Sequence, residues 1–288
     1  MMSTKKCLIC NDGRKNETLY WHRDTDSGEI WVWCNKCDCG RSIWKYCEEA
    51  GLNLSEFLKG DFDFIEAAPN EVTRMDWPQV FIPLSDARAK KGVEYLRSRG
   101  LSPVGDMYYD MNDEGIVFPY HFDSVFCGAQ IRFLKERVNK EGDVWKITTM
   151  PGTRLGLVIY AYNQTNIMPH VKGFIVTEGA FNALSIQQSL DKMYGGAYKS
   201  PWKAVACSGS GGSSHQLEVF GDLITRGYKV VCAPDNDAAG LKMFKKYISN
   251  KAATHFAITD GEQDWNDVLV KLDNTEFARY VLSKIRKL

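Results

Sequence analysis

The sequence has no excess of charge of either sign. Its 288 residues include 36 Lys and Arg and 36 Asp and Glu, so the formal net charge is zero at pH 7. Overall charge therefore does not predict a nucleic-acid partner, which would need a local basic surface. No apolar run approaches the roughly 20 residues of a membrane span, and no apolar segment follows the lysines near the start. We expect a soluble, non-secreted, cytoplasmic protein with no membrane partner.

The sequence also lacks a P-loop. Its glycine-rich segment SGSGGSSH, residues 208–215, does not end in the Gly-Lys-Ser/Thr of that motif, and no other segment matches. A self-contained ATPase or helicase motor is therefore not expected. We interpret residues 208–215 as an ordinary turn that could also lie close to a phosphate.

The length and the 44% content of hydrophobic residues allow more than one domain. Residues 1–57 hold most of the cysteines, and residues 58–80 form an acidic, proline-containing segment that we interpret as a linker. Residues 81–167 contain one helical pattern followed by short β-branched and aromatic runs. From 168 to 288, strands and helices alternate in four units, which predicts an α/β fold with a mostly parallel sheet flanked by helices.

Six of the nine cysteines fall between Cys7 and Cys47, a clustering that indicates a metal site. Two CxxC turns offer four thiolates in the spacing of one closed, structural zinc site: Cys7, Cys10, Cys34 and Cys37. In the run CNKCDC, Cys39 could replace Cys37 as the fourth ligand. We expect Cys47 to lie in a hydrophobic core. Unligated buried thiols are the alternative explanation.

Aromatic and basic residues are interleaved around the second CxxC turn, including Trp33 and Lys36. Such a mixture suits stacking on bases and contact with phosphates of single-stranded nucleic acid. The alternative is that a small domain uses its aromatic residues for its own core.

Acidic side chains follow three of the predicted strands. Glu178 follows GFIVT, Asp235 and Asp237 follow YKVVCAP, and Asp264 precedes a helix. Each of them could simply cap a helix. Asp235 and Asp237 are two residues apart in an extended segment, however, so their charges lie close together and call for a cation. The pattern predicts Mg²⁺ bound through carboxylates and substrate phosphates, beyond the carboxyl ends of the strands.

Four segments in this order, TEGAFNALSI, ACSGSGGSS, APDNDAAG and EQDWNDVL, resemble the motifs of the Toprim domain of primases, topoisomerases and some nucleases. The segments EYLRSRGLS, GIVFPYHFDSVFCGAQIRFL and TTMPGTRLGLVIYAYN resemble the RNA-polymerase core of bacterial and phage primases. The cysteine-rich segment resembles their zinc-binding domain, a zinc ribbon. The resemblance covers nearly the whole chain, and the order of the three parts is that of primases.

The resemblance implies that Glu178 is the catalytic acid and that Mg²⁺, one to three ions, is held by Glu178, Asp235, Asp237 and Asp264. It also implies that Arg132 meets template or nucleotide, on a basic surface extended by Lys135, Arg137, Lys146 and Arg154. Asn182 stands where many primases have Asp, which places an additional metal contact at that position in doubt. Gln263 stands where the last motif often has Lys, which removes a phosphate contact, and Asn266 in place of a second Asp is a milder departure.

The activity implied is Mg²⁺-dependent synthesis of short RNA primers on single-stranded DNA from ribonucleoside triphosphates, during replication in a bacterium or a phage-infected cell. The zinc segment would read a short start site, and the replicative helicase would be a separate chain. Two alternatives remain, a Toprim nuclease and a non-enzymatic DNA-binding protein of the recombination-mediator type.

Overall fold

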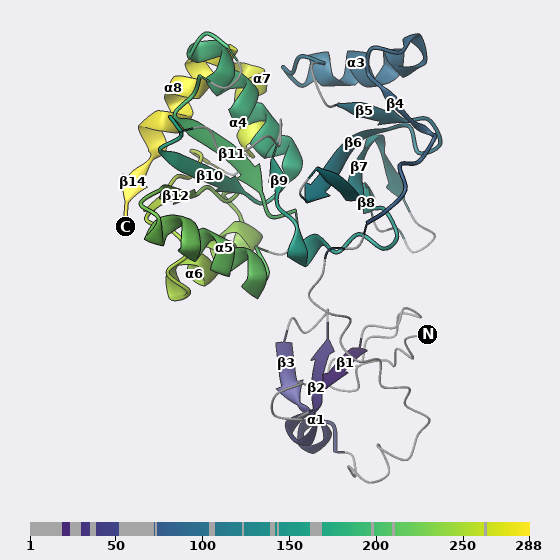
Figure 1. Ribbon diagram of the computed structural model, residues 1–288, viewed down its shortest axis with the longest axis vertical. Coiled ribbons are helices and arrows are strands. Elements are labelled where there is room, and N and C mark those ends of the chain that lie inside the picture. The colour runs from purple at the N-terminus through teal and green to yellow at the C-terminus, as the bar shows by residue number, and fades with distance from the viewer. Residues whose placement is uncertain are drawn as a thin grey trace. The chain divides into compact units, whose positions relative to one another are not determined.

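The computed structural model divides into two compact units, Met1–Glu71 and Val72–Leu288 (Figure 1). It describes residues 19–23, 30–34, 39–51, 72, 74–103, 107–122, 124–138, 142, 144–161, 169–196, 199–208, 211–261 and 264–288. Within these ranges, every helix is too short or too polar to cross a membrane.

The first unit contains a three-stranded antiparallel sheet followed by a short helix. Its elements are β1 (Leu19–Arg23), β2 (Ile30–Cys34), β3 (Cys39–Ser42) and α1 (Ile43–Glu49). Val32, Ile43, Tyr46 and Cys47 are buried. The expectation that Cys47 belongs to a hydrophobic core is therefore confirmed.

Two of the candidate zinc ligands fall in described strands. Cys34 ends β2 and Cys39 begins β3, and the two residues pair across the antiparallel ladder. Cys7, Cys10, Cys37 and Lys36 lie outside the described residues. The zinc ribbon and the choice between Cys37 and Cys39 stay predictions.

The second unit begins with an antiparallel sheet, as the strand-rich pattern predicts. Its order is β4-β5-β6-β7-β8. The strands are β4 (Phe81–Pro83), β5 (Tyr108–Asp110), β6 (Gly115–Phe122), β7 (Val125–Val138) and β8 (Val144–Thr149), with the 3₁₀ helix η1 (Ala87–Ala89) and helix α3 (Lys90–Ser98) between β4 and β5. Because successive side chains of a strand point to opposite faces, Phe118 packs into one core cluster and Val117 into another.

Part of the segment expected as a linker packs against this sheet. The ring of Trp77 meets the rings of Phe81, Tyr108 and Phe126 at centroid distances of 5.7, 4.5 and 4.8 Å. Met75 and Val80 are also partly buried against the same cluster. Residues 74–80 thus belong to the second unit, which begins at Val72.

The rest of the second unit is built on a six-stranded sheet of order β14-β13-β12-β10-β11-β9. Its four central strands are parallel, as predicted, and the edge strands β9 and β14 are antiparallel. The strands are β9 (Tyr160–Ala161), β10 (Gly173–Thr177), β11 (Trp202–Ala206), β12 (Lys229–Cys232), β13 (His255–Phe256) and β14 (Arg286–Lys287).

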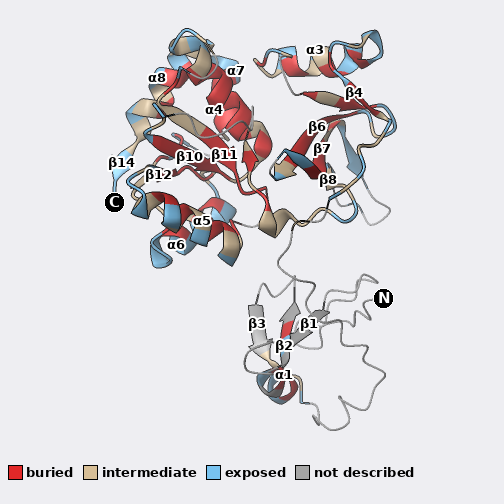
Figure 2. Ribbon diagram, viewed as in Figure 1, coloured by how far each residue is buried: buried red, intermediate tan, exposed pale blue. Residues whose placement is uncertain are grey.

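Helices cover both faces of this sheet. One core cluster joins the sheet to α4 (Ala180–Met193), α7 (Trp265–Lys271) and α8 (Asn274–Lys284), and a second joins it to α5 (Ser214–Thr225) and α6 (Ala238–Ser249). The same two layers are visible in Figure 1, and Figure 2 shows the central strands and α4 as the most buried elements. Helix α8 ends at Lys284, and the chain then adds strand β14 to the sheet.

The two sheets of the second unit share a core and are joined by a short chain of hydrogen bonds. Tyr120 Oη donates to Gln130 Oε1 at 2.9 Å, and Gln130 Nε2 donates to the carbonyl oxygen of Ser208 at 3.3 Å. Ser208, at φ 53°, lies in the predicted turn at 208–215, whose Ser213 caps α5. The turn therefore anchors one sheet to the other.

Two helical glycines provide a test of the packing beside the strand ends. A Cβ atom at Gly240 would lie 1.8 Å from the carbonyl oxygen of Asp235, whereas one at Gly221 in α5 would meet nothing within 4 Å. We expect Gly240→Ala to lower the free energy of unfolding by about 2–3 kcal/mol because the turn at Asp235 must shift. Gly221→Ala should raise it by about 0.5–1 kcal/mol, the gain in helix propensity. Urea denaturation measures both, and equal effects would contradict the close approach at Gly240.

Candidate active site at the carboxyl edge of the parallel sheet

The acidic residues predicted from the sequence meet at one edge of the six-stranded sheet. Glu178 directly follows β10, Asp235 lies three residues after β12, and Asp264 begins α7 in the connection that follows β13. Because β10, β12 and β13 are parallel neighbours, their carboxyl ends lie at the same edge, where open α/β sheets bind ligands.

Glu178 is half-buried and incompletely paired. Its Oε1 atom is buried and has no hydrogen-bond partner among the described residues. Burial raises the pKa of this carboxyl, the charge of Asp237 raises it further, and a hydrogen bond from the Asp235 backbone amide lowers it in part. A buried carboxylate oxygen without a donor is costly, so it is suited to receive a cation or a proton from a ligand.

Asp235 is the most perturbed acid of the group. Burial raises its pKa to about 7, with further contributions from Glu178 first and then from Asp264, Asp237 and Asp267. Its Oδ1 accepts a hydrogen bond of 2.8 Å from Asn182 Nδ2. The carboxylates are therefore close enough for their charges to oppose one another, as the spacing in the sequence predicts.

Asp237 and Asp264 also cap helices. Asp237 accepts from the amide of Gly240 at 2.7 Å at the start of α6, and Asp264 accepts from the amide of Asp267 at 2.7 Å at the start of α7. Each cap uses one carboxylate oxygen, Oδ1 in both cases. The capping role and a ligand-binding role are thus compatible, because the second oxygen remains for a ligand.

A buried amide network holds Asp235 in place, and sequence reasoning did not find it. Asn182 Oδ1 accepts from the backbone amide of Asn266 at 3.2 Å, and Asn266 Nδ2 donates to Ser185 Oγ at 2.8 Å and to the Arg99 carbonyl at 3.0 Å. Asn182 and Asn266 are two of the three departures from the family pattern noted in the sequence. The signal in the sequence that could have revealed the network was the presence of these polar side chains on the buried faces of helices.

Arg132 of β7 contacts the first turn of α4, which follows Glu178. Its guanidinium carbon is 5.9 Å from the ring centroid of Phe181, and that of Arg99 is 5.7 Å from the same ring. Phe181 is three residues after Glu178, in the first turn of α4. Arg99 Nη2 also lies 3.4 Å from Asp267 Oδ1. Two cations therefore stand beside the acidic edge, one of them, Arg99, not found from the sequence.

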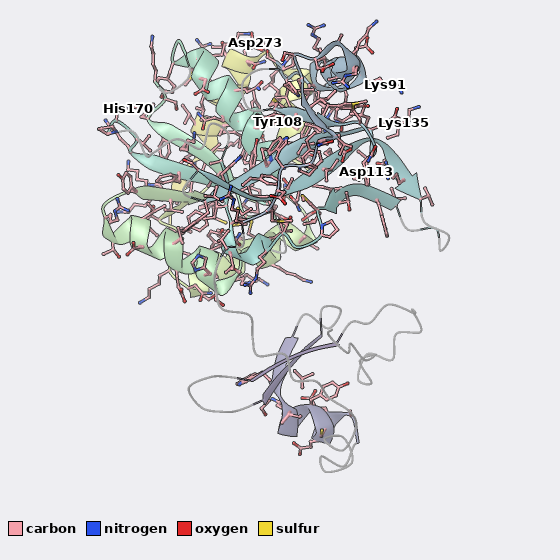
Figure 3. All side chains as sticks on the ribbon, turned by 45° about the vertical axis from the view of Figure 1, so that its right-hand side comes forward. Lys91, Tyr108, Asp113, Lys135, His170 and Asp273 are labelled. Carbon is pink, nitrogen blue, oxygen red and sulfur yellow. The ribbon has the colours of Figure 1, made fainter. Side chains whose placement is uncertain are left out.

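The other predicted basic residues lie further along β7 and β8 or beyond them. Arg137 pairs with Asp113 at 2.8 Å and Lys146 with Glu136 at 3.0 Å, so part of this positive charge is neutralised. Lys135 is exposed on β7, and Figure 3 shows it near the Asp113 end of the sheet. Arg154 precedes the 3₁₀ helix η2 (Leu155–Leu157), and Trp33 lies in β2 of the first unit.

The carboxylates do not form a preassembled metal cage. Within the described parts of the chain, no group of three or more His, Cys, Asp or Glu side chains is arranged to hold a metal ion. The donor set of carboxylate oxygens is nevertheless the one that Mg²⁺ prefers, and Mg²⁺ is commonly held by one or two carboxylates plus substrate phosphates. Glu178 Oε1 and the crowded Asp235 fit such an ion.

A family model described as Toprim-like matches residues 175–269. This range contains Glu178, Asp235, Asp237 and Asp264, and it confirms the Toprim domain expected from the four motifs. A search of curated proteins gives no match.

Solved structures of primases are similar to this chain. The structure titled as the DnaG catalytic core matches with 17% identity and a TM-score of 0.50, over 71% of this chain and 76% of that one. The E. coli primase catalytic core gives 18% identity and a TM-score of 0.49, over 72% and 76%. The primase fragment of the bacteriophage T7 primase-helicase gives 12% and 0.43, over 92% and 98%. The match to the DnaG core establishes that the chain has the fold of a primase core, as its motifs predict.

The charge of Asp235 should lower the stability of the metal-free protein. Its pKa is about 7 in the folded protein, against 3.8 for an ordinary aspartate, so folding favours the protonated form. Its contribution to stability is therefore greatest below about pH 4 and is lost as the pH rises to about 7. In EDTA at pH 8, we expect Asp235→Asn to raise Tm by about 2–4 °C for each kcal/mol gained in the free energy of unfolding. At pH 4 the substitution should have little effect on Tm.

Differential scanning calorimetry across this pH range measures the effect, with Asp222→Asn as the matched control. Asp222 is an exposed acid on α5. A pH-independent gain in Tm at Asp235, or the same gain in both variants, would contradict the crowding of the carboxylates.

Proposed function

We propose that this protein is a DNA primase that synthesises short RNA primers on single-stranded DNA from ribonucleoside triphosphates. The observation that carries the proposal is the contact of Arg132, from the antiparallel sheet, with Phe181, which lies three residues after Glu178 in the Toprim domain. A Toprim domain alone would serve several reactions. The primase-core fold, with Gln130 joining the two sheets, supports polymerisation in particular.

In this mechanism the 3′-hydroxyl of one ribonucleotide attacks the α-phosphate of the next, and pyrophosphate leaves. Glu178 Oε1, which is buried without a donor in a carboxyl of raised pKa, would either accept the hydroxyl proton or orient the metal ion. Arg132 and its basic neighbours Lys135, Arg137, Lys146 and Arg154 position the triphosphate and the template through their phosphates. Asn182 fixes the carboxylate of Asp235 toward the reacting groups.

Glu178, Asp235, Asp237 and Asp264 would hold Mg²⁺, which when bound supplies positive charge to the attacking and leaving oxygens. Next to burial, the charges of the neighbouring acids raise the pKa of Asp235, and the charge of the ion would offset this repulsion. Substrate phosphates would supply further ligands, so the acids need no closed cage in the absence of substrate.

In the first unit, Cys7, Cys10 and Cys34 with Cys37 or Cys39 would bind one structural Zn²⁺. The position of Cys34 at the end of β2 and of Cys39 at the start of β3 supports a ligand turn between these strands. Trp33 and Lys36 at this turn would contact bases and phosphates of the single-stranded start site. A separate replicative helicase chain is the further partner that we expect.

The primary test is primer synthesis on a mixed-sequence single-stranded DNA with the four ribonucleotides and Mg²⁺. The wild type should produce short labelled oligoribonucleotides. Glu178→Gln and Asp235→Asn should each lose activity about 100-fold or more, because each removes a charge at the reacting atoms. Asp222→Asn, which makes the same change on the exposed face of α5, should retain full activity.

Other outcomes separate the alternatives. Degradation of the DNA in Mg²⁺ or Mn²⁺ without ribonucleotides would identify a nuclease. DNA binding without any product, indifferent to Glu178→Gln, would identify a non-enzymatic binding protein. An Asp235→Asn variant as active as the wild type would refute the site itself.

A separate prediction concerns zinc. Cys34→Ser should release the metal and abolish start-site choice, while extension of a supplied dinucleotide is partly retained because the acidic edge lies in the second unit. Elemental analysis of the purified protein measures zinc, and sequencing of the primers measures start-site choice.

Cys37→Ser and Cys39→Ser form the matched pair of controls for the zinc prediction. One of the two should lose zinc and the other should keep it, which identifies the fourth ligand. Retention of zinc by Cys34→Ser would contradict the proposed site. Loss of extension together with start-site choice would assign the zinc segment a purely structural role.

A further inference from the structure

The edge of the six-stranded sheet opposite the acids carries a segregated positive charge. Five chain segments meet at the amino ends of the parallel strands: 169–173, 199–203, 226–230, 251–256 and 285–288. Together they contain eight Lys or Arg residues and two His residues, and not one Asp or Glu. In a chain whose net charge is zero, this concentration at one edge is the local basic surface that overall charge does not reveal.

The strands bring these cations side by side. Lys229 pairs with Gly173, which directly follows Lys172, and Lys287 of β14 pairs with His255 of β13. Partial burial lowers the pKa of His255, and the charges of Lys229 and Lys287 lower it further. We define the basic edge as Lys172, Lys229, Arg286 and Lys287, all of which are exposed.

Within the described chain, none of these four side chains forms an ion pair with an acid. Arg286 Nη1 donates only to the carbonyls of Ser283 and Ile285, at 2.5 and 2.9 Å. By contrast, neighbouring Lys284 is paired with Asp260 at 2.6 Å, so we leave it outside the basic edge.

Helix dipoles do not account for the basic edge. Cations commonly follow the carboxyl ends of helices, and Arg226 after α5 and Lys251 after α6 have that explanation. Lys229, Arg286 and Lys287, however, lie in strands, and Lys172 directly precedes β10. Strands have only small net dipoles, so the fold itself does not require positive charge there.

We propose that the basic edge binds the phosphate backbone of a nucleic-acid strand at a second site, away from the candidate active site. β10 has five residues, so at about 3.3 Å per residue the two edges are about 16 Å apart. Figure 3 shows His170, which precedes the start of β10, on the opposite side of the unit from Lys135. A strand held here contributes affinity and does not reach the reacting atoms.

A nucleic acid fits this edge better than an acidic protein segment. Leu288 is the only large apolar side chain in the five segments that is exposed, so a protein partner would find little apolar area to bury. Phosphates need only charge, which lysines supply without a fixed geometry. Tyr228, with Arg226 5.8 Å from its ring, adds an aromatic beside Lys229 on which a base can stack.

The test is binding of a fluorescent 20-nucleotide thymidine strand to the full chain in EDTA, measured by anisotropy across a salt series. The variant Lys229→Gln with Lys287→Gln keeps the apolar stems and removes two charges. We expect the slope of log K against log salt to fall by about 1.4, and affinity at 0.1 M salt to fall by about 25-fold, for two lost phosphate contacts.

The matched control is Lys242→Gln with Lys245→Gln, two exposed lysines of α6. It changes net charge equally and should leave the slope unchanged. Acetylation footprinting of the wild type provides a second readout that needs no variant. Lys172, Lys229 and Lys287 should be protected by the oligonucleotide, and Lys242 and Lys245 should not.

The proposal is overturned by an unchanged salt slope in the basic-edge variant or by the absence of protection. It is also overturned if the variant loses binding of a poly-glutamate peptide while keeping that of the oligonucleotide, which would assign the edge to an acidic protein segment. These measurements use neither ribonucleotides nor Mg²⁺. They therefore remain decisive whether or not the protein makes primers.

Discussion

Carboxylates at the carboxyl edge of the parallel sheet repel one another, and the rest of the second unit is arranged around this repulsion. Burial, followed by the charges of Glu178, Asp264, Asp237 and Asp267, raises the pKa of Asp235 to about 7. A protein selected only for stability would not gather acids in a partly buried position. The arrangement is intelligible as a site that completes its charge balance by binding a cation and phosphates.

Neutral hydrogen-bond donors hold the acids in place and add no competing charge. Asn182 donates to Asp235, Asn266 donates to Ser185, and backbone amides at the starts of α6 and α7 donate to Asp237 and Asp264. A lysine in place of Asn182 would neutralise Asp235 permanently and exclude a metal. An amide fixes the direction of the carboxylate and leaves its charge for the ligand.

The sequence was sufficient for the order of elements and for the grouping of the acids. Parallel βα units have few possible topologies, so residues that follow successive strands must meet at one edge, as Glu178 and Asp235 do. It was not sufficient for partners that depend on how the two sheets pack. The contacts of Arg99 with Asp267 and of Gln130 with Ser208 join residues 168 and 78 positions apart, and no local pattern encodes them.

Helix and strand ends were also decided by tertiary contacts. The sequence from Asp273 onward has a helical pattern, yet Arg286 and Lys287 pair with β13 because the open edge of that strand offers hydrogen bonds that a longer helix would forgo.

The same strand direction that gathers the acids also separates the charges of the second unit. Parallel strands have all their carboxyl ends at one edge and all their amino ends at the other. Residues that follow the strands therefore gather at the first edge, and residues that precede them gather at the second. Here the carboxyl edge collects Glu178, Asp235 and Asp264, and the amino edge collects Lys172 and Lys229. A polyanionic ligand is repelled by the acids in the absence of a cation and attracted by the lysines at the opposite edge, so the basic edge can bind it without the metal that the acidic edge requires.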